Sequence, residues 1–112
     1  MGLGYRDMAD IERFLNPRLS DLSDPFLLPD MEPAVRRLQQ AILADESIAV
    51  YGDYDVDGIV STGLLVQVLH RLGARMVTPC LPSRQKEGYG LSLAALKRCI
   101  AQCHPSLLVT VD

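Results

Sequence analysis

Three aspartates with the spacing of metal ligands lie in the segment Tyr51-Gly-Asp-Tyr-Asp-Val-Asp-Gly58, directly after the apolar run Ile48-Ala-Val50. Carboxylates this close repel one another unless a divalent cation or strong hydrogen-bond donors neutralise them. Mg²⁺ and Mn²⁺ prefer oxygen ligands, and a pair of such ions can activate a water and stabilise the leaving oxygen of a phosphoryl group. Asp53, Asp55 and Asp57 therefore predict a metal site that acts on phosphate esters.

A second set of candidate residues lies in segment 82–92, which follows the next predicted strand. An arginine there could clamp a phosphate through two hydrogen bonds, and a lysine would add a point charge. Two glycines permit backbone conformations that other residues avoid, and a tyrosine between them could stack on a base. A basic loop of this kind is more often only a solvated turn, but its place beside the carboxylates favours substrate binding. The predicted substrate-binding residues in this segment are Arg84, Lys86, Gly88, Tyr89 and Gly90.

The predicted secondary structure brings both sets of residues to one edge of a sheet. From residue 47 onward we expect strands at 48–51, 75–81 and 107–111, a helix at 58–72, and a helix that starts at 91 or 92 and ends at 102. A β-α-β-α-β order implies a parallel sheet with right-handed crossovers. The predicted fold class is therefore α/β, a partial three-layer parallel sheet with strand order 2-1-3. Ligands bind such sheets beyond the carboxyl ends of the strands, so Asp112 should meet the aspartate turn as a fourth metal ligand.

The sequence divides into residues 1–46, predicted to be a helical extension, and residues 47–112, predicted to be the first part of a truncated α/β domain. The extension has a helix at 8–15, an irregular connector with three prolines, and a second helix that Asp30 caps and that ends near Asp45. A parallel sheet of three strands leaves an edge open. We therefore expect the chain to be the N-terminal part of a longer protein.

The composition predicts one soluble, folded domain. Of the 112 residues, 48% are apolar and 22% are charged, which suffices for a core and is not typical of disorder. The chain has no apolar run of the ~20 residues that span a bilayer and no signal peptide, so we predict a cytoplasmic protein without membrane contact. The net charge is −3, but residues 48–112 carry 6 basic and 5 acidic residues. Metal binding would make that half clearly positive, which suits an anionic substrate.

The three cysteines, an odd number without a secretion signal, are predicted to be reduced thiols. Cys99 and Cys103 lie four residues apart on the apolar face of a predicted helix and are expected in the core. A zinc site that combines them with His104 is disfavoured, because the ligand spacing of zinc fingers and ribbons is absent.

Other interpretations of the aspartate segment fit the residues less well. A calcium-binding EF-hand loop also begins D-x-D-x-D-G, but its twelfth position would be Leu64 instead of glutamate. A turn that only caps the next helix needs one aspartate. Gly58 is expected to allow a tight turn into that helix. Ser61 and Thr62, in its first turn, could contact a phosphate or a metal-bound water, or could bond the backbone. The motifs of P-loop and Rossmann nucleotide binders are absent.

Three segments together resemble the DHH phosphoesterase superfamily and, within it, the RecJ-type single-strand-specific exonucleases. They are Val50-Tyr-Gly-Asp-Tyr-Asp-Val-Asp-Gly-Ile-Val-Ser-Thr62, the loop from Arg84 to Ser92, and Leu108-Val-Thr-Val-Asp112. The preceding Asp24-Pro-Phe-Leu-Leu-Pro-Asp-Met31 is similar to the lead-in of the bacterial RecJ proteins. The first segment marks the superfamily, and the Arg84 loop and the lead-in narrow the resemblance to the RecJ type.

The resemblance implies catalytic metal ligands at Asp55, Asp57 and Asp112. Related pyrophosphatases carry a histidine where this chain has Tyr51, so Asp53 either takes part of that role as a ligand or orients the turn. The Asp-His-His motif that names the family is absent from these 112 residues. The metal site would therefore be half built, and we predict negligible nuclease activity for residues 1–112 alone.

For the parent protein, the resemblance implies Mn²⁺- or Mg²⁺-dependent degradation of single-stranded DNA from the 5′ end, in recombination and repair. It also implies a single-strand-binding protein and a helicase as partners. One alternative is a DHH-family phosphodiesterase acting on short oligonucleotides or cyclic dinucleotides, which the Arg84 loop disfavours. Another is a non-catalytic DHH-like scaffold, in which we would expect the acidic ligands to be lost.

Overall fold

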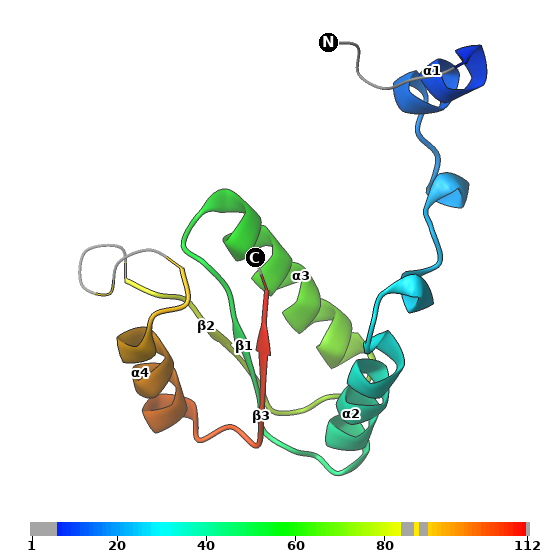
Figure 1. Cartoon of the computed structure of the whole chain (residues 1–112). Helices are drawn as coiled ribbons and strands as arrows, with labels where there is room; N and C mark the ends of the chain where they lie inside the picture. The colour runs from blue at the N-terminus through cyan, green and yellow to red at the C-terminus, as the bar shows by residue number, and fades with distance from the viewer. Residues whose placement is uncertain (1–6, 84–86, 88–89, 112) are drawn as a thin grey trace. The chain divides into compact units, whose positions relative to one another are not determined.

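A computed structural model of the chain describes residues 7–83, 87 and 90–111 (Figure 1). Contacts divide the chain into two compact units, residues 1–33 and 34–112. The elements are, in chain order, α1 (Met8–Leu15), the 3₁₀ turns η1 (Leu19–Asp21) and η2 (Pro25–Leu27), α2 (Met31–Leu43), β1 (Ile48–Tyr51), α3 (Val56–Arg71), β2 (Val77–Cys80), α4 (Leu93–Cys103) and β3 (Leu107–Thr110).

In the first unit, aspartate side chains cap two of the short elements. Asp7 caps α1, where its Oδ1 accepts a hydrogen bond of 2.8 Å from Asp10 N. Asp24 caps η2 in the same way, with 2.9 Å to Phe26 N. Helix α1 has the bounds that the sequence predicted, and the connector that was predicted to be irregular contains the two 3₁₀ turns.

The sheet of the second unit is parallel, with the predicted strand order β2-β1-β3. All four residues of the central strand β1 are buried. Its last residue, Tyr51, pairs with Cys80 of β2 and with Thr110 of β3. The carboxyl ends of all three strands therefore reach the same edge of the sheet.

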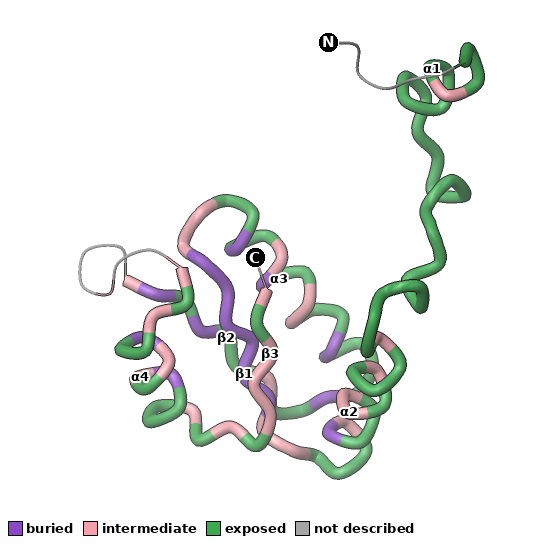
Figure 2. Tube along the Cα trace, in the orientation of Figure 1, coloured by how far each residue is buried: buried purple, intermediate pink, exposed green. Residues whose placement is uncertain are grey.

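Helices cover both faces of this sheet, with α2 and α3 on one side and α4 on the other (Figure 1). Successive side chains of β1 point to opposite faces of the sheet, as in any β-strand. Ile48 and Val50 pack with Ala41 of α2 and Leu69 of α3. The opposite core is formed by Ala49, Tyr51, Cys80, Ala95 and Cys99. Figure 2 shows buried residues along β1 and at a few positions of α2, α3 and α4. The helices on both faces of the parallel sheet confirm the predicted three-layer α/β arrangement.

Helix α2 contributes to the sheet unit although it lies in the part predicted to be an extension. Its Ala41 is fully buried in the first core, and an ion pair of 2.6 Å joins Arg37 to Glu46 just before β1. The domain boundary at residue 46 stays a prediction. The predicted capping residue Asp30 has φ 59°, in the left-handed region, and not the extended backbone of a typical N-cap.

Helix α3 begins two residues earlier than predicted, at Val56, because Asp55 caps it. It ends at Arg71, one residue earlier than predicted. Gly73 follows the C-cap as predicted, with φ +100°, and its backbone nitrogen donates to His70 O. Much of the outer surface of α3 is apolar and exposed, including Val60 and Leu64. In the part of the chain that the structure describes, no helix combines the length and the apolar character needed to cross a bilayer.

Candidate metal and nucleic-acid site

The turn after β1 packs its backbone directly against the first turns of α3. A Cβ atom at Gly52 would overlap the Thr62 hydroxyl oxygen, and one at Gly58 would lie 2.5 Å from the backbone nitrogen and carbonyl oxygen of Asp53. Only glycine fits such a close approach. Gly58 was expected to allow a tight turn into the helix. It lies inside α3, however, and its φ is not positive. The absence of a side chain at Gly58 leaves room for the Asp53 backbone, and its absence at Gly52 leaves room for the Thr62 hydroxyl group and the Gly58 carbonyl oxygen.

Two of the predicted metal ligands are held by backbone hydrogen bonds. Asp53 is 6% exposed, and its Oδ1 accepts a hydrogen bond of 2.6 Å from Tyr54 N. Asp55 Oδ1 accepts one of 2.8 Å from Gly58 N, which caps α3. The hydrogen bond of Asp53 lies within the turn itself, and its role as a metal ligand or as the residue that orients the turn stays a prediction. Asp55 keeps its second oxygen without a hydrogen bond from any described residue.

Asp57 lies exposed in the first turn of α3. Among the described residues, no lysine or arginine forms an ion pair with any of the three aspartates, and the Asp57 carboxylate has no hydrogen-bond partner. The partial positive charge at the start of α3 offsets only part of this negative charge. Uncompensated carboxylate oxygens are the ligands that hard divalent cations prefer, so Asp55 and Asp57 fit a Mn²⁺ or Mg²⁺ ion.

The end of β3 lies beside the end of β1, because Val111 N donates a hydrogen bond of 2.9 Å to Tyr51 O. The next residue is Asp112, the predicted fourth ligand, which lies outside the described residues. Within residues 7–83, 87 and 90–111, the three aspartates do not gather their oxygens around one point. The aspartate turn can therefore supply ligands from Asp55 and Asp57, and a complete site needs further ones.

The hydroxyl groups of Ser61 and Thr62 bond the backbone of their own helix. Ser61 Oγ donates to Asp57 O at 2.7 Å, and Thr62 Oγ1 donates to Gly58 O at 2.6 Å. Thr62 is 2% exposed and packs under Gly52. We therefore give Thr62 a structural role, the alternative that the sequence had left open. Ser61 is only half-buried, and its contact with a substrate stays a prediction.

The predicted substrate-binding loop after β2 is described only in part. Arg84, Lys86, Gly88 and Tyr89 lie outside the described residues, and their roles stay predictions. Gly90 is described, and its φ of 72° is the left-handed conformation that favours glycine.

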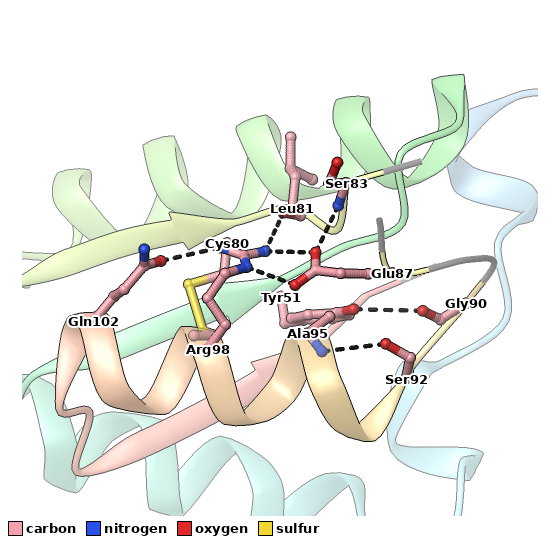
Figure 3. A network of polar contacts seen from close by, with 11 residues as sticks. Tyr51, Cys80, Leu81, Ser83, Glu87, Gly90, Ser92, Ala95, Arg98 and Gln102 are labelled. Carbon is pink, nitrogen blue, oxygen red and sulfur yellow. Dashed lines mark hydrogen bonds and ion pairs between the residues drawn. A yellow bond between two sulfur atoms is a disulfide. The ribbon is translucent and has the colours of Figure 1, made fainter. Parts of the chain in front are cut away.

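An arginine of α4 joins the described residues of this segment to the sheet (Figure 3). Arg98 Nε donates to Glu87 Oε1 at 2.7 Å, and its Nη2 donates to Leu81 O at 2.9 Å. Glu87 Oε2 also accepts a hydrogen bond of 2.7 Å from Ser83 N. The Glu87 side chain is only 9% exposed, and its hydrogen bond raises the pKa of Arg98. The ion pair therefore fixes Glu87 against the end of β2.

Tyr51 holds the far end of the same segment. Its hydroxyl group donates to Gly90 O at 3.4 Å, and the residue is 2% exposed. Burial raises the pKa of the Tyr51 phenol above its usual value, and the negative charges of Glu87 and Asp53 raise it further. Sequence analysis missed the roles of Tyr51 and Arg98. The available signal was that Glu87 is the only acidic residue in an otherwise basic segment.

The cysteines differ from the prediction of three reduced thiols. Cys80 of β2 and Cys99 of α4 form a disulfide, and Cys103 is free. The expectation that Cys99 belongs to the core is confirmed, since it is fully buried. The disulfide could not be foreseen because its partners lie 19 residues apart and meet only through the crossover between strand and helix.

Comparisons with known proteins agree with this geometry. Residues 47–112 match the DHH family, N-terminal domain. A Bacillus subtilis protein named single-stranded-DNA-specific exonuclease RecJ is 42% identical over 109 residues, which cover 97% of this chain and 14% of that protein. Its namesake from Dickeya dadantii is 38% identical over 109 residues, covering 97% of this chain and 18% of that protein.

A solved structure is similar as well. It is described as the crystal structure of exonuclease RecJ bound to manganese, and it matches with a TM-score of 0.66 at 38% identity. The match covers 77% of this chain and 22% of that chain. This chain spans only 14–18% of the length of the curated relatives that it matches.

Proposed function

The chain belongs to the DHH family, and from that membership we propose that it supplies the first metal ligands of an exonuclease that degrades single-stranded DNA. The observation that carries the proposal is the acidic turn at the carboxyl edge of the sheet, whose aspartates form no ion pair with any lysine or arginine that the structure describes, in a chain 42% identical to a RecJ exonuclease. A scaffold without catalysis would have no need to keep these carboxylates close together against their mutual repulsion.

The proposed metal ligands are Asp55, Asp57 and Asp112, with Asp53 orienting the turn that carries the first two. A divalent cation bound there would polarise a water and the scissile phosphate. The close approach of Gly52 to Thr62 and of Gly58 to the Asp53 backbone supports this proposal, because it holds the acidic turn against the start of α3. The manganese named for the RecJ structure supports Mn²⁺ as the ion, and Mg²⁺ is the chemically similar alternative.

The proposed substrate contacts come from the segment after β2 and from Ser61. Arg84 and Lys86 would bind phosphates, while Tyr89, between Gly88 and Gly90, would stack on a base. The contacts of Glu87 and Gly90 support this proposal, because they hold the segment at the edge of the sheet where the acidic turn lies.

We propose digestion from the 5′ end, in recombination and repair, with a single-strand-binding protein and a helicase as partners. Work on chromosomal DNA would place the protein in the cytoplasm. These assignments are supported by the name that the relatives share and by the identity over nearly the whole chain.

The test uses the protein that carries this chain, with 5′-labelled single-stranded DNA, the matching duplex and dinucleotides as substrates. We expect digestion of the single strand with Mn²⁺ and none in the presence of EDTA. Asp57→Asn should lower the rate by about a hundredfold or more, because it removes a metal ligand. Asp45→Asn is the matched control, since an exposed ion pair with Arg75 is the only contact that the described residues show for the Asp45 side chain.

Equal activity of the two variants would contradict the assignment of Asp57. Preference for dinucleotides over long single strands would instead favour the short-oligonucleotide phosphodiesterase, and metal binding without any hydrolysis would favour the scaffold.

A further inference from the structure

Three sulfur atoms gather on the α4 side of the sheet, in a region that the proposed nuclease function does not use. Cys80 ends β2, while Cys99 and Cys103 lie one helical turn apart on α4. Cys80 and Cys99 are joined by a disulfide (Figure 3). Cys103 Sγ lies 3.5 Å from Cys80 Sγ, and all three Sγ atoms lie within 4.8 Å of one another.

The three cysteines differ in how far reagents from solution can reach them. Cys99 is fully buried and Cys80 is 5% exposed, so a small thiol or disulfide in solution has little access to either. Cys103 is only half-buried. A free and partly accessible thiol therefore lies beside one sulfur of a buried disulfide, and thiol–disulfide exchange requires this kind of access.

We propose that Cys80, Cys99 and Cys103 form a thiol–disulfide exchange site in which Cys103 passes oxidation and reduction to the buried Cys80–Cys99 pair. In the oxidising direction, the Cys103 thiolate attacks a low-molecular-weight disulfide such as oxidised glutathione and forms a mixed disulfide, releasing one thiol. The Cys80 thiolate then attacks Cys103 Sγ and releases the second thiol. The Cys99 thiolate finally attacks Cys80 Sγ and frees the Cys103 thiolate.

The sequence of steps is balanced and reversible. Two protein thiols are oxidised to one disulfide, and one molecule of oxidised glutathione is reduced to two thiols. In the reverse direction, the Cys103 thiolate attacks Cys80 Sγ, and a thiol from solution then reduces the Cys80–Cys103 bond. The same geometry serves both directions because Cys80 is the shared partner.

The fold can keep this site intact when the disulfide is open. Arg98 precedes Cys99 and Leu81 follows Cys80, and their hydrogen bond of 2.9 Å joins the same two elements without a covalent link. The ion pair between Arg98 and Glu87 adds a second connection. Reduction should therefore leave α4 on the sheet and the three thiols near one another.

The experiment follows oxidation of the reduced full chain by oxidised glutathione, with acid quenching, alkylation and mass-spectrometric peptide mapping. We expect the first glutathione adduct on Cys103, then a Cys80–Cys103 bond, and a Cys80–Cys99 bond at the end. Cys103→Ser should slow formation of the Cys80–Cys99 bond by about tenfold or more, because the accessible thiol is lost. Cys99→Ser should trap the Cys80–Cys103 bond.

Controls separate exchange from a merely structural role of Cys103. In about 8 M urea the chain is unfolded and all three thiols are equally accessible. The rate difference between the wild-type chain and Cys103→Ser should therefore disappear. Equal rates in the folded state, or a first adduct on Cys80 or Cys99, would overturn the proposal. Tight stoichiometric Zn²⁺ binding by the reduced chain that blocks oxidation would also overturn it, in favour of a thiolate metal site.

Discussion

The acidic turn after β1 and the segment after β2 leave neighbouring strands at the same edge of the sheet, but different contacts hold them. In the acidic turn, Asp53 and Asp55 bond backbone nitrogens one and three residues further along. In the segment after β2, Glu87 bonds Arg98 eleven residues away, and Gly90 bonds Tyr51 across 39 residues. The first is shaped by its own sequence, and the second depends on α4 and β1.

This difference separates the two halves of the proposed chemistry. The acidic turn is built by close backbone packing and is expected to persist as long as α3 stays on the sheet. In the segment after β2, the described residues Glu87 and Gly90 are held by side chains of other elements, so these contacts can be removed without disturbing the acidic turn. The comparison therefore predicts that substitutions in the two regions have separable effects.

The largest effect is expected for Gly58→Ala, which tests the close packing of the acidic turn. The new methyl group would lie 2.5 Å from backbone atoms of Asp53 that cannot move aside like a side chain. We expect the free energy of unfolding to fall by about 2–4 kcal/mol in urea denaturation.

Gly63→Ala is the matched control in the same helix, because a Cβ there meets nothing within 4 Å. It should raise the stability by about 0.5–1 kcal/mol, since alanine restricts the unfolded chain and favours the helix. Similar losses for both variants would mean that the turn does not depend on close backbone packing.

Arg98→Met should have the next largest effect, because it leaves the Glu87 carboxylate, 9% exposed, without its guanidinium partner. We expect a loss of about 1.5–3 kcal/mol in the free energy of unfolding. Arg75→Met removes an ion pair in which the arginine side chain is 80% exposed, and it should cost about 0.5 kcal/mol or less. A double-mutant cycle with Glu87→Gln isolates the pair, and a coupling energy near zero would refute the anchoring role of Arg98.

Asp55→Ala should lower the stability by about 1 kcal/mol in the presence of EDTA, because it removes the N-cap of α3. Asp57→Ala should change it little, since the Asp57 carboxylate has no hydrogen-bond partner among the described residues and its loss relieves repulsion. Any stabilisation by added Mn²⁺ should be lost in both variants. A cost for Asp57→Ala equal to that for Asp55→Ala would mean that Asp57 also has a structural role.

The same contrast explains what the sequence could predict. The bounds of α1 and β1 and the sheet order follow from hydrophobic patterns and from the alternation of strands and helices, which are local signals. The start of α3 was placed too late because Asp55 was considered as a metal ligand and not as a cap. Strand β2 is shorter than predicted, since Arg75 and Met76 precede its first residue, Val77.

The contacts that escaped prediction are those that need the register of the sheet. The pairing of Tyr51 with Cys80 places the end of β1 beside the start of the segment that Tyr51 anchors. Likewise, Cys80 meets Cys99 only because α4 crosses back over β2. No local pattern encodes either distance, so both could be found only with the fold in hand.

A smaller effect than that of Arg98→Met or Asp55→Ala is expected for Tyr51→Phe, which tests the second anchor of the segment after β2. The hydrogen bond from the Tyr51 hydroxyl group to Gly90 O is long, at 3.4 Å, and Gly90 is only half-buried, so water can replace the lost donor. The aromatic ring keeps its place in the core, and the free energy of unfolding should fall by only about 0.5 kcal/mol. A loss as large as that of Arg98→Met would mean that β1, and not α4, is the main anchor of this segment. In that case the segment and the acidic turn would share their support, and substitutions in the two regions would no longer act separately.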